Sequence, residues 1–192
     1  MTAVHPGPPR LQVELPPRPL TLEDVTQLAA VDKGHRYELV DGNLLVMPPA
    51  DADHANLIIR IGAWFLVAHH HGLVLATPGL RITEKSDGRI PDLVVVRKPL
   101  PRGVVWVDPA NVALVIEIVS PGSERIDREI KPGEYARAGI REFWRVERGD
   151  GDSDTTVHQY RLGQGERGER AYISHAAVLL DDLLAGAPPA LA

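Results

Sequence analysis

Two continuous runs of branched aliphatic residues constrain the fold of this chain more than any other feature. Residues 91–96 read PDLVVV, residues 112–120 read VALVIEIVS, and Gly and Pro residues lie between them. A strand with one face in water alternates apolar and polar residues, whereas a continuous apolar run is typical of a central strand that is covered on both faces. The sequence therefore predicts two central strands, at 92–96 and 113–119.

The other segments predict a mixed order of helices and strands around this centre. Apolar residues recur at helical spacing in 22–33, 54–71 and 124–138. Shorter strands are expected at 36–40, 44–47, 73–76, 80–83, 104–107, 142–147, 155–161 and 171–174. We expect Trp64, Phe65 and Trp144 in the core. With no internal repeat, this order predicts an α/β or α+β fold with a central mixed β-sheet.

The length of 192 residues fits one domain of ordinary size. Residues 1–20 contain six prolines, and we expect them to form an extended arm, followed by a single domain at 21–185 and a tail at 186–192. No stretch is apolar for long enough to span a bilayer, and the N-terminus lacks the hydrophobic core of a signal peptide. The sequence therefore predicts no membrane partner.

The composition excludes several classes of site. The chain has no cysteine, which rules out disulfides, thiolate zinc sites and cysteine nucleophiles and favours a reducing cytoplasm. The net charge of −5 argues against a protein that coats nucleic acid through bulk charge. It does not exclude an enzyme of nucleic acids, because a metal site needs local acids and brings its own positive charge.

Each of the two apolar runs carries one acid, Asp92 at the start of the first and Glu117 near the end of the second. If the two strands are antiparallel neighbours, these carboxylates converge at one edge of the sheet. Two close carboxylates repel unless a cation lies between them, and oxygen ligands suit Mg²⁺ or Mn²⁺ better than zinc. Two simpler readings stay open: Asp92 can be a turn residue after Pro91, and Glu117 can form a buried ion pair with a residue such as Arg125.

Six short blocks occur in an order that resembles a known family. They are RYELVDGNL (36–44), PPxxxxH (48–54), PDLVVV (91–96), VIEIVSPGS (115–123), DxxxK (127–131) and YAxAGIxEFW (135–144). Together they are similar to the Uma-two family of restriction-endonuclease-like proteins, which is assigned to the PD-(D/E)XK nuclease superfamily. The resemblance covers roughly residues 22–180. It implies a restriction-endonuclease-like core in which helices flank the mixed sheet.

The resemblance assigns roles to particular residues. It implies that Asp92 and Glu117 are metal ligands and that the carbonyl of Ile118 is a third contact. It makes Glu38 either a group that supports these ligands or a ligand of a second metal. The superfamily's lysine is replaced here by Val119, and the nearest matching lysine in the family pattern is Lys131.

The position of Lys131 leaves two readings open. Asp127 and Lys131 are four residues apart and would share one face of a helix, from which the lysine could reach the end of the strand. The alternative is a solvent-exposed pair of little energetic weight. Pro132 follows directly and disfavours helical geometry at Lys131, which predicts a new helix starting at Pro132.

One single histidine and one run of three are further candidate site residues. His54 matches a histidine of the family and is expected either to line the site or to cap and pack the helix that begins there. The consecutive residues His69, His70 and His71 point in different directions on a helix and cannot all bind one ion.

These features predict a Mg²⁺- or Mn²⁺-dependent endonuclease that hydrolyses phosphodiester bonds of DNA. Arginines of 125–141 would contact phosphates, and relatives in the family imply a homodimer in the cytoplasm. The alternative is a nuclease-fold protein that has lost activity and binds nucleic acid or a partner, which the displaced lysine and the acidic net charge favour.

Overall fold

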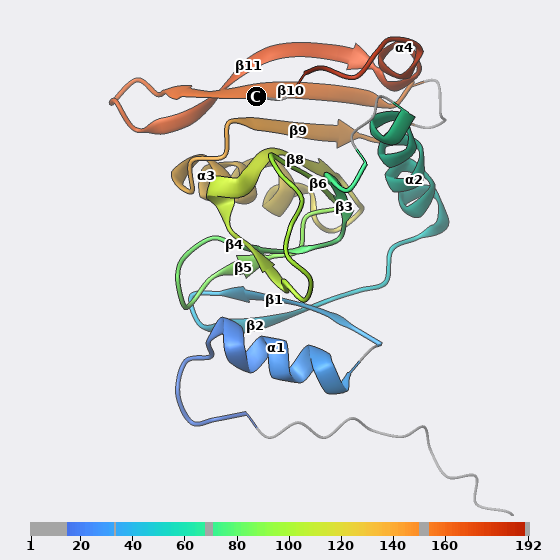
Figure 1. The fold of residues 1–192 in the computed structure, drawn as a ribbon. Helices are drawn as coiled ribbons and strands as arrows, with labels where there is room; N and C mark the ends of the chain where they lie inside the picture. Colours follow the sequence, from blue (N-terminus) through green and yellow to red (C-terminus); the bar gives the residue numbers. More distant parts are fainter. Residues whose placement is uncertain (1–14, 33, 68–70, 150–153, 191–192) are drawn as a thin grey trace, which may run out of the picture.

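A six-stranded mixed β-sheet forms the centre of the protein, as the computed structural model shows for residues 15–32, 34–67, 71–149 and 154–190 (Figure 1). Its strand order is β11-β10-β9-β8-β6-β3. The strands are β3 (Val74–Ala76), β6 (Leu93–Val96), β8 (Val112–Ile118), β9 (Glu142–Glu147), β10 (Thr156–Gln164) and β11 (Arg170–Leu179). All pairs are antiparallel except β8 with β9, which run parallel. The two predicted central strands, β6 and β8, are direct neighbours.

A second, five-stranded sheet lies beside the first, with the order β2-β1-β5-β4-β7. Its strands are β1 (Arg36–Val40), β2 (Asn43–Met47), β4 (Gly79–Arg81), β5 (Gly88–Arg89) and β7 (Trp106–Val107). Helix α1 (Leu22–Val31) packs against β1, and its apolar side chains bury Tyr37 and Leu39 (Figure 1). Strands β1 and β2 are joined at Asp41 and Gly42, both with positive φ, as expected for an Asp-Gly hairpin turn.

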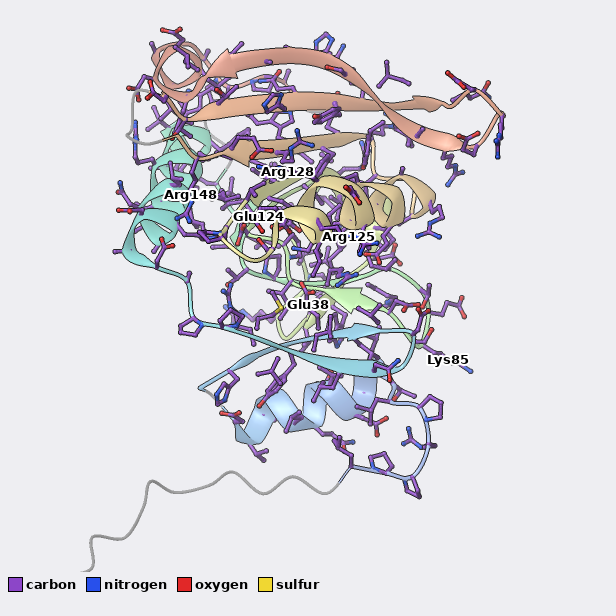
Figure 2. All side chains as sticks on the ribbon, turned by 180° about the vertical axis from the view of Figure 1, so that it is seen from behind. Glu38, Lys85, Glu124, Arg125, Arg128 and Arg148 are labelled. Atoms are coloured by element: carbon purple, nitrogen blue, oxygen red, sulfur yellow. The ribbon has the colours of Figure 1, made fainter. Side chains whose placement is uncertain are left out.

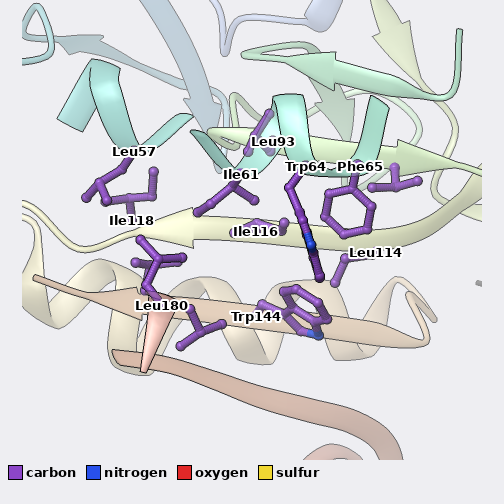
Figure 3. Close-up of a cluster of buried hydrophobic side chains, with 13 residues drawn as sticks. Leu57, Ile61, Trp64, Phe65, Leu93, Leu114, Ile116, Ile118, Trp144 and Leu180 are labelled. Atoms are coloured by element: carbon purple, nitrogen blue, oxygen red, sulfur yellow. The ribbon is translucent and has the colours of Figure 1, made fainter. Parts of the chain in front are cut away.

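Helices cover both faces of the central strands. Helix α2 (Ala52–Val67) places Leu57, Ile61 and Phe65 on the face formed by alternate residues of β6 and β8, as Figure 3 shows. The opposite face packs against Tyr135 of helix α3 (Lys131–Arg137) and against Leu80. Because every residue of β6 and β8 is buried, the prediction of central strands covered on both faces is confirmed.

The structure differs from the sequence-based expectation in several elements. The last strand, β11, is much longer than the expected 171–174, and helix α4 (Leu180–Ala185) and strand β5 were not predicted. The expected helix at 124–138 is a π-helical turn (Ile126–Ile130) that continues directly into α3.

Trp64, Phe65 and Trp144 lie in the core as predicted. His69 and His70 lie outside the described residues, and His71 lies in an exposed turn. No helix among the described residues is long and apolar enough to cross a membrane.

Candidate active site

Asp92 and Glu117 come together because β6 and β8 are antiparallel. Leu93 pairs with Ile116, so Asp92, which precedes Leu93, lies opposite Glu117, which follows Ile116. The backbone N–H of Ile118 donates a 2.8 Å hydrogen bond to Oδ2 of Asp92, which fixes this carboxylate beside Glu117. Both acids are buried, with 6% and 1% of their surface exposed. The predicted convergence at the sheet edge is present, and Asp92 is more than a turn residue.

Lys131 reaches the end of β8 from the start of α3. Its Nζ lies 3.0 Å from Oε2 of Glu117 and 2.8 Å from Oδ1 of Asp127. The side chains of all three residues are buried, so the pair of Asp127 and Lys131 is not a solvent-exposed one. Glu117 pairs with this lysine, whereas Arg125, the partner considered from the sequence, pairs with Glu129.

The expectation that Pro132 disfavours helical geometry at Lys131 is wrong. Lys131 has φ −56° and ψ −42°, which are helical values, and its N–H donates to the carbonyl of Ile126, five residues earlier. This wider π turn changes the hydrogen-bond register just before the proline, so Pro132 lies in the first turn of α3, where a missing N–H is tolerated. The π turn therefore continues the helix through Lys131 and keeps Asp127 on the same face.

Burial dominates the protonation of this cluster. Burial, together with the nearby charges of Asp92 and Asp127, raises the pKa of Glu117 to about 8, against the attraction of Lys131. Burial lowers the pKa of Lys131, but the carboxylates of Glu117, Glu38 and Asp127 outweigh it and hold this pKa above its usual value. The lysine is therefore a fixed cation within a group of carboxylates.

A tyrosine hydroxyl contacts Glu117, and a histidine imidazole contacts Asp92. The hydroxyl of Tyr135 donates to Oε1 of Glu117. His54 lies with Nε2 2.8 Å from Oδ1 of Asp92 and Nδ1 2.8 Å from the hydroxyl of Ser120. In the neutral tautomer of His54 that donates from Nε2–H to Asp92, Nδ1 accepts from the hydroxyl of Ser120. His54 thus lines the site and orients Asp92, in line with the first of its two sequence-based readings.

Glu38 lines the same groove as the two acids, and both of its carboxylate oxygens have partners within the protein. Its Oε2 accepts from Arg89 at 2.9 Å and its Oε1 accepts from the backbone N–H of Ile90 at 3.0 Å. Arg89 also makes two 2.7 Å hydrogen bonds to Glu134 of α3. Glu38 therefore supports the chain just before Asp92, and its role as a ligand of a second metal stays a prediction.

Sequence reasoning missed three residues of this cluster: Arg89, Glu134 and Tyr135. A signal for Tyr135 was present, since it lies four residues after Lys131 and so shares its helix face. Arg89 gave a weaker signal, a lone cation two residues before Pro91. Nothing in the local sequence indicates that Glu134, rather than another acid, meets it.

The buried charges leave room for a divalent cation. The fully buried acids near the site outnumber the permanently charged bases by two, the acids being Glu38, Asp92, Glu117 and Asp127 and the bases Arg89 and Lys131. A buried carboxylate without a countercharge takes up a proton, as the raised pKa of Glu117 indicates, or binds a metal ion that replaces this proton. Among the described residues no three His, Asp or Glu side chains form a metal cluster. A cation here would therefore take the carboxylates of Asp92 and Glu117, the Ile118 carbonyl and water, an oxygen set that fits Mg²⁺.

A groove of about 570 Å³ opens beside these residues, and we call it the active-site groove. Residues 45–50, from β2 and the following segment, form part of its wall, and residues 120–123 and Ile126 also line it. Asp92, Glu117 and Lys131 lie along it. The groove gives a substrate access to the two acids.

Arginines near the site are mostly paired with acids. Arg128 makes hydrogen bonds of 2.9 and 2.7 Å to Glu147, and Arg148 makes bonds of 2.8 and 2.9 Å to Asp51. Figure 2 shows Arg125 and Arg128 on the segment that follows β8, and Arg148 beside α2. Arg125 is 82% exposed, with Glu129 at 3.5 Å. The predicted phosphate contacts from 125–141 therefore stay a prediction.

The mixed sheet and the two converging acids define a restriction-endonuclease-like fold. The chain belongs to the Uma2 family, described as "Putative restriction endonuclease", whose family model matches residues 22–187. A crystal structure of a putative nuclease of the DUF820 family from Anabaena variabilis ATCC 29413 is similar, with a TM-score of 0.60, 15% identity and coverage of 87% of this chain and 98% of that one. At this identity the likeness shows the fold alone. No curated protein matched.

Proposed function

We propose that this protein is a metal-dependent endonuclease that hydrolyses phosphodiester bonds of DNA. The observation that carries the proposal is the meeting of Asp92, Glu117 and the cation of Lys131 within the active-site groove. Family membership supports a nuclease. The excess of buried carboxylates supports the need for a divalent cation at the same place.

Each residue has a distinct part in this proposal. Asp92, Glu117 and the Ile118 carbonyl would hold Mg²⁺ or Mn²⁺. When bound, such a cation polarises a phosphoryl oxygen and lowers the pKa of a bound water. Lys131 places a fixed positive charge beside Glu117, where it can offset the charge that develops on the phosphoryl group. His54 orients Asp92, and Glu38 with Arg89 positions the chain that leads into it.

One observation favours the second candidate, a nuclease-fold protein without activity that binds nucleic acid or a partner. All four carboxylate oxygens of Asp92 and Glu117 already have partners within the protein. The two functions are separated by incubating purified protein with plasmid DNA and with single-stranded circular DNA, each in Mg²⁺ and in EDTA. The proposal expects cleavage products of at least one of the two DNAs only in Mg²⁺, and both DNAs unchanged in Mg²⁺ would favour the second candidate. A homodimer and a cytoplasmic location stay predictions from the sequence.

Replacement of the lysine gives a test of its charge. Lys131→Met is expected to lower the rate of cleavage about 100-fold, the lower range for loss of a positioned charged or acid–base group. Mn²⁺ binding should not weaken, because the variant removes a cation that competes for the same carboxylates. Calorimetric titration with Mn²⁺ and initial rates of plasmid nicking measure the two effects. Lys85→Met, at an exposed site far from the groove (Figure 2), is the matched control. Parallel loss of Mn²⁺ binding and cleavage in Lys131→Met would contradict the assigned role.

A further inference from the structure

The wall of the active-site groove formed by residues 45–50 is apolar although it borders two carboxylates. It presents Leu45, Val46, Met47, Pro48 and Pro49 to the groove. In the β1–β2 hairpin Glu38 pairs with Leu45, and Arg36 pairs with Met47. Paired residues of antiparallel strands project from the same face, so Leu45 and Met47 point to the side that carries Glu38. The apolar wall is therefore part of the face that holds the cluster.

This wall is accessible, and a further apolar side chain lines the groove. Leu45 is 37% exposed and Pro48 and Pro49 are exposed, although most large apolar side chains of the described residues are buried. Ile126 of the π turn also lines the groove. The volume of about 570 Å³ lies within the roughly 300–1,000 Å³ of sites that enclose a small ligand. The groove can thus receive a flat apolar group against the apolar wall.

The charges of the groove are unlike those of a surface that grips a duplex. Its cations are Arg36 and Lys131, and Lys131 is engaged by Glu117 and Asp127. Proteins that hold duplex DNA neutralise several phosphates with exposed cations. A duplex also turns its charged backbone outward and hides its base faces in the stack, so it does not offer the face of a base to this wall.

We infer that the active-site groove binds an unpaired nucleobase against Leu45, Met47 and Pro48, and that the substrate is single-stranded nucleic acid. The inference rests on the proposed function, since it puts the phosphodiester at Asp92 and Glu117. Bases bind apolar and aromatic surfaces through their faces when they leave the stack. Arg36, on the same face of β1, supplies a positive charge for a neighbouring phosphate.

Binding of defined oligonucleotides tests the inference without relying on cleavage. Fluorescence anisotropy would compare the affinities of the protein for three labelled ligands: a 15-nucleotide oligothymidylate, an abasic strand of equal length and a duplex of equal length. The buffer would contain Ca²⁺, a hard cation that takes oxygen ligands. We expect the oligothymidylate to bind about tenfold more tightly than the other two, since stacking of bases adds to phosphate contacts. Equal affinity for the oligothymidylate and the abasic strand, or tighter binding of the duplex, would overturn the inference.

A variant of the wall localises the effect. Leu45→Ser is expected to weaken binding of oligothymidylate about fivefold, as for the loss of one base contact, and to leave binding of the abasic strand unchanged. Ile173→Ser, at a 51% exposed apolar position of β11, is the matched control and should bind as wild type. Unchanged binding by Leu45→Ser would overturn the base site. Absence of Mg²⁺-dependent cleavage with these base effects intact would instead count against the proposed function alone.

Discussion

Asp92→Asn is expected to lower Mg²⁺-dependent cleavage of DNA by about 1,000-fold or more. Asparagine keeps the shape of aspartate and can still accept the hydrogen bond from Ile118, but it brings no negative charge to a cation. Loss of a bound metal removes several kcal/mol of charge stabilisation from a phosphoryl transition state, and each 1.4 kcal/mol is a factor of ten in rate. The initial rate of plasmid nicking measures the effect.

The fold of Asp92→Asn should be unchanged, because the substitution removes one of the excess buried negative charges. Circular dichroism and the melting temperature check this. Asp53→Asn, an exposed acid in the first turn of α2, is the matched control and should cleave as wild type. Full activity of Asp92→Asn in Mg²⁺ would remove the basis for the proposed mechanism.

Arg89→Ala is expected to lower the free energy of unfolding by about 3–5 kcal/mol, the usual cost of removing one partner from a buried ion pair. Arg89 and Glu38 are 3% and 1% exposed, so the variant leaves a buried carboxylate that water cannot solvate. It also frees Glu134, and with it the link between β1 and the helix that carries Lys131. Urea unfolding followed by circular dichroism gives the difference.

One companion variant separates charge from geometry at Arg89, and a second variant is a control at an exposed arginine. Arg89→Lys keeps a cation but cannot reproduce the forked hydrogen bonds to Glu134, so it should recover only part of the lost stability. Arg102→Ala, at an exposed turn, should change the free energy of unfolding by less than about 0.5 kcal/mol. A loss below 1 kcal/mol in Arg89→Ala would show that the cluster does not depend on this arginine.

The centre of the fold was predictable because its signal is local. A continuous apolar run is visible within one strand, and the acid that each run carries is visible with it, so β6, β8 and the meeting of Asp92 with Glu117 followed from the sequence. The assignment of Lys131 depended on the resemblance to a family, because its local context, with Pro132 next to it, indicated the wrong backbone geometry.

The pairing of the second sheet and the supporting ion pairs were not predictable in this way. Four of its strands overlap expected ones, but β5 contains two residues, too few for any periodicity to show, and it joins β1 to β4. Arg89 is buried by acids that lie 51 and 45 residues away in the sequence, and only the tertiary fold brings them together. The apolar wall of the groove was likewise hidden, since Leu45 and Met47 look like ordinary residues of a hairpin strand.

The central claim is that Asp92 and Glu117 together hold a divalent cation. The most direct test is a crystal of the protein soaked in Mn²⁺, with anomalous scattering measured at a wavelength where manganese contributes. The account predicts an anomalous peak within about 2–2.5 Å of a carboxylate oxygen of each acid and near the Ile118 carbonyl. It also predicts that the peak disappears in crystals of Glu117→Ala. A fully soaked crystal with no peak between the two acids, or with the peak unchanged in Glu117→Ala, would contradict it.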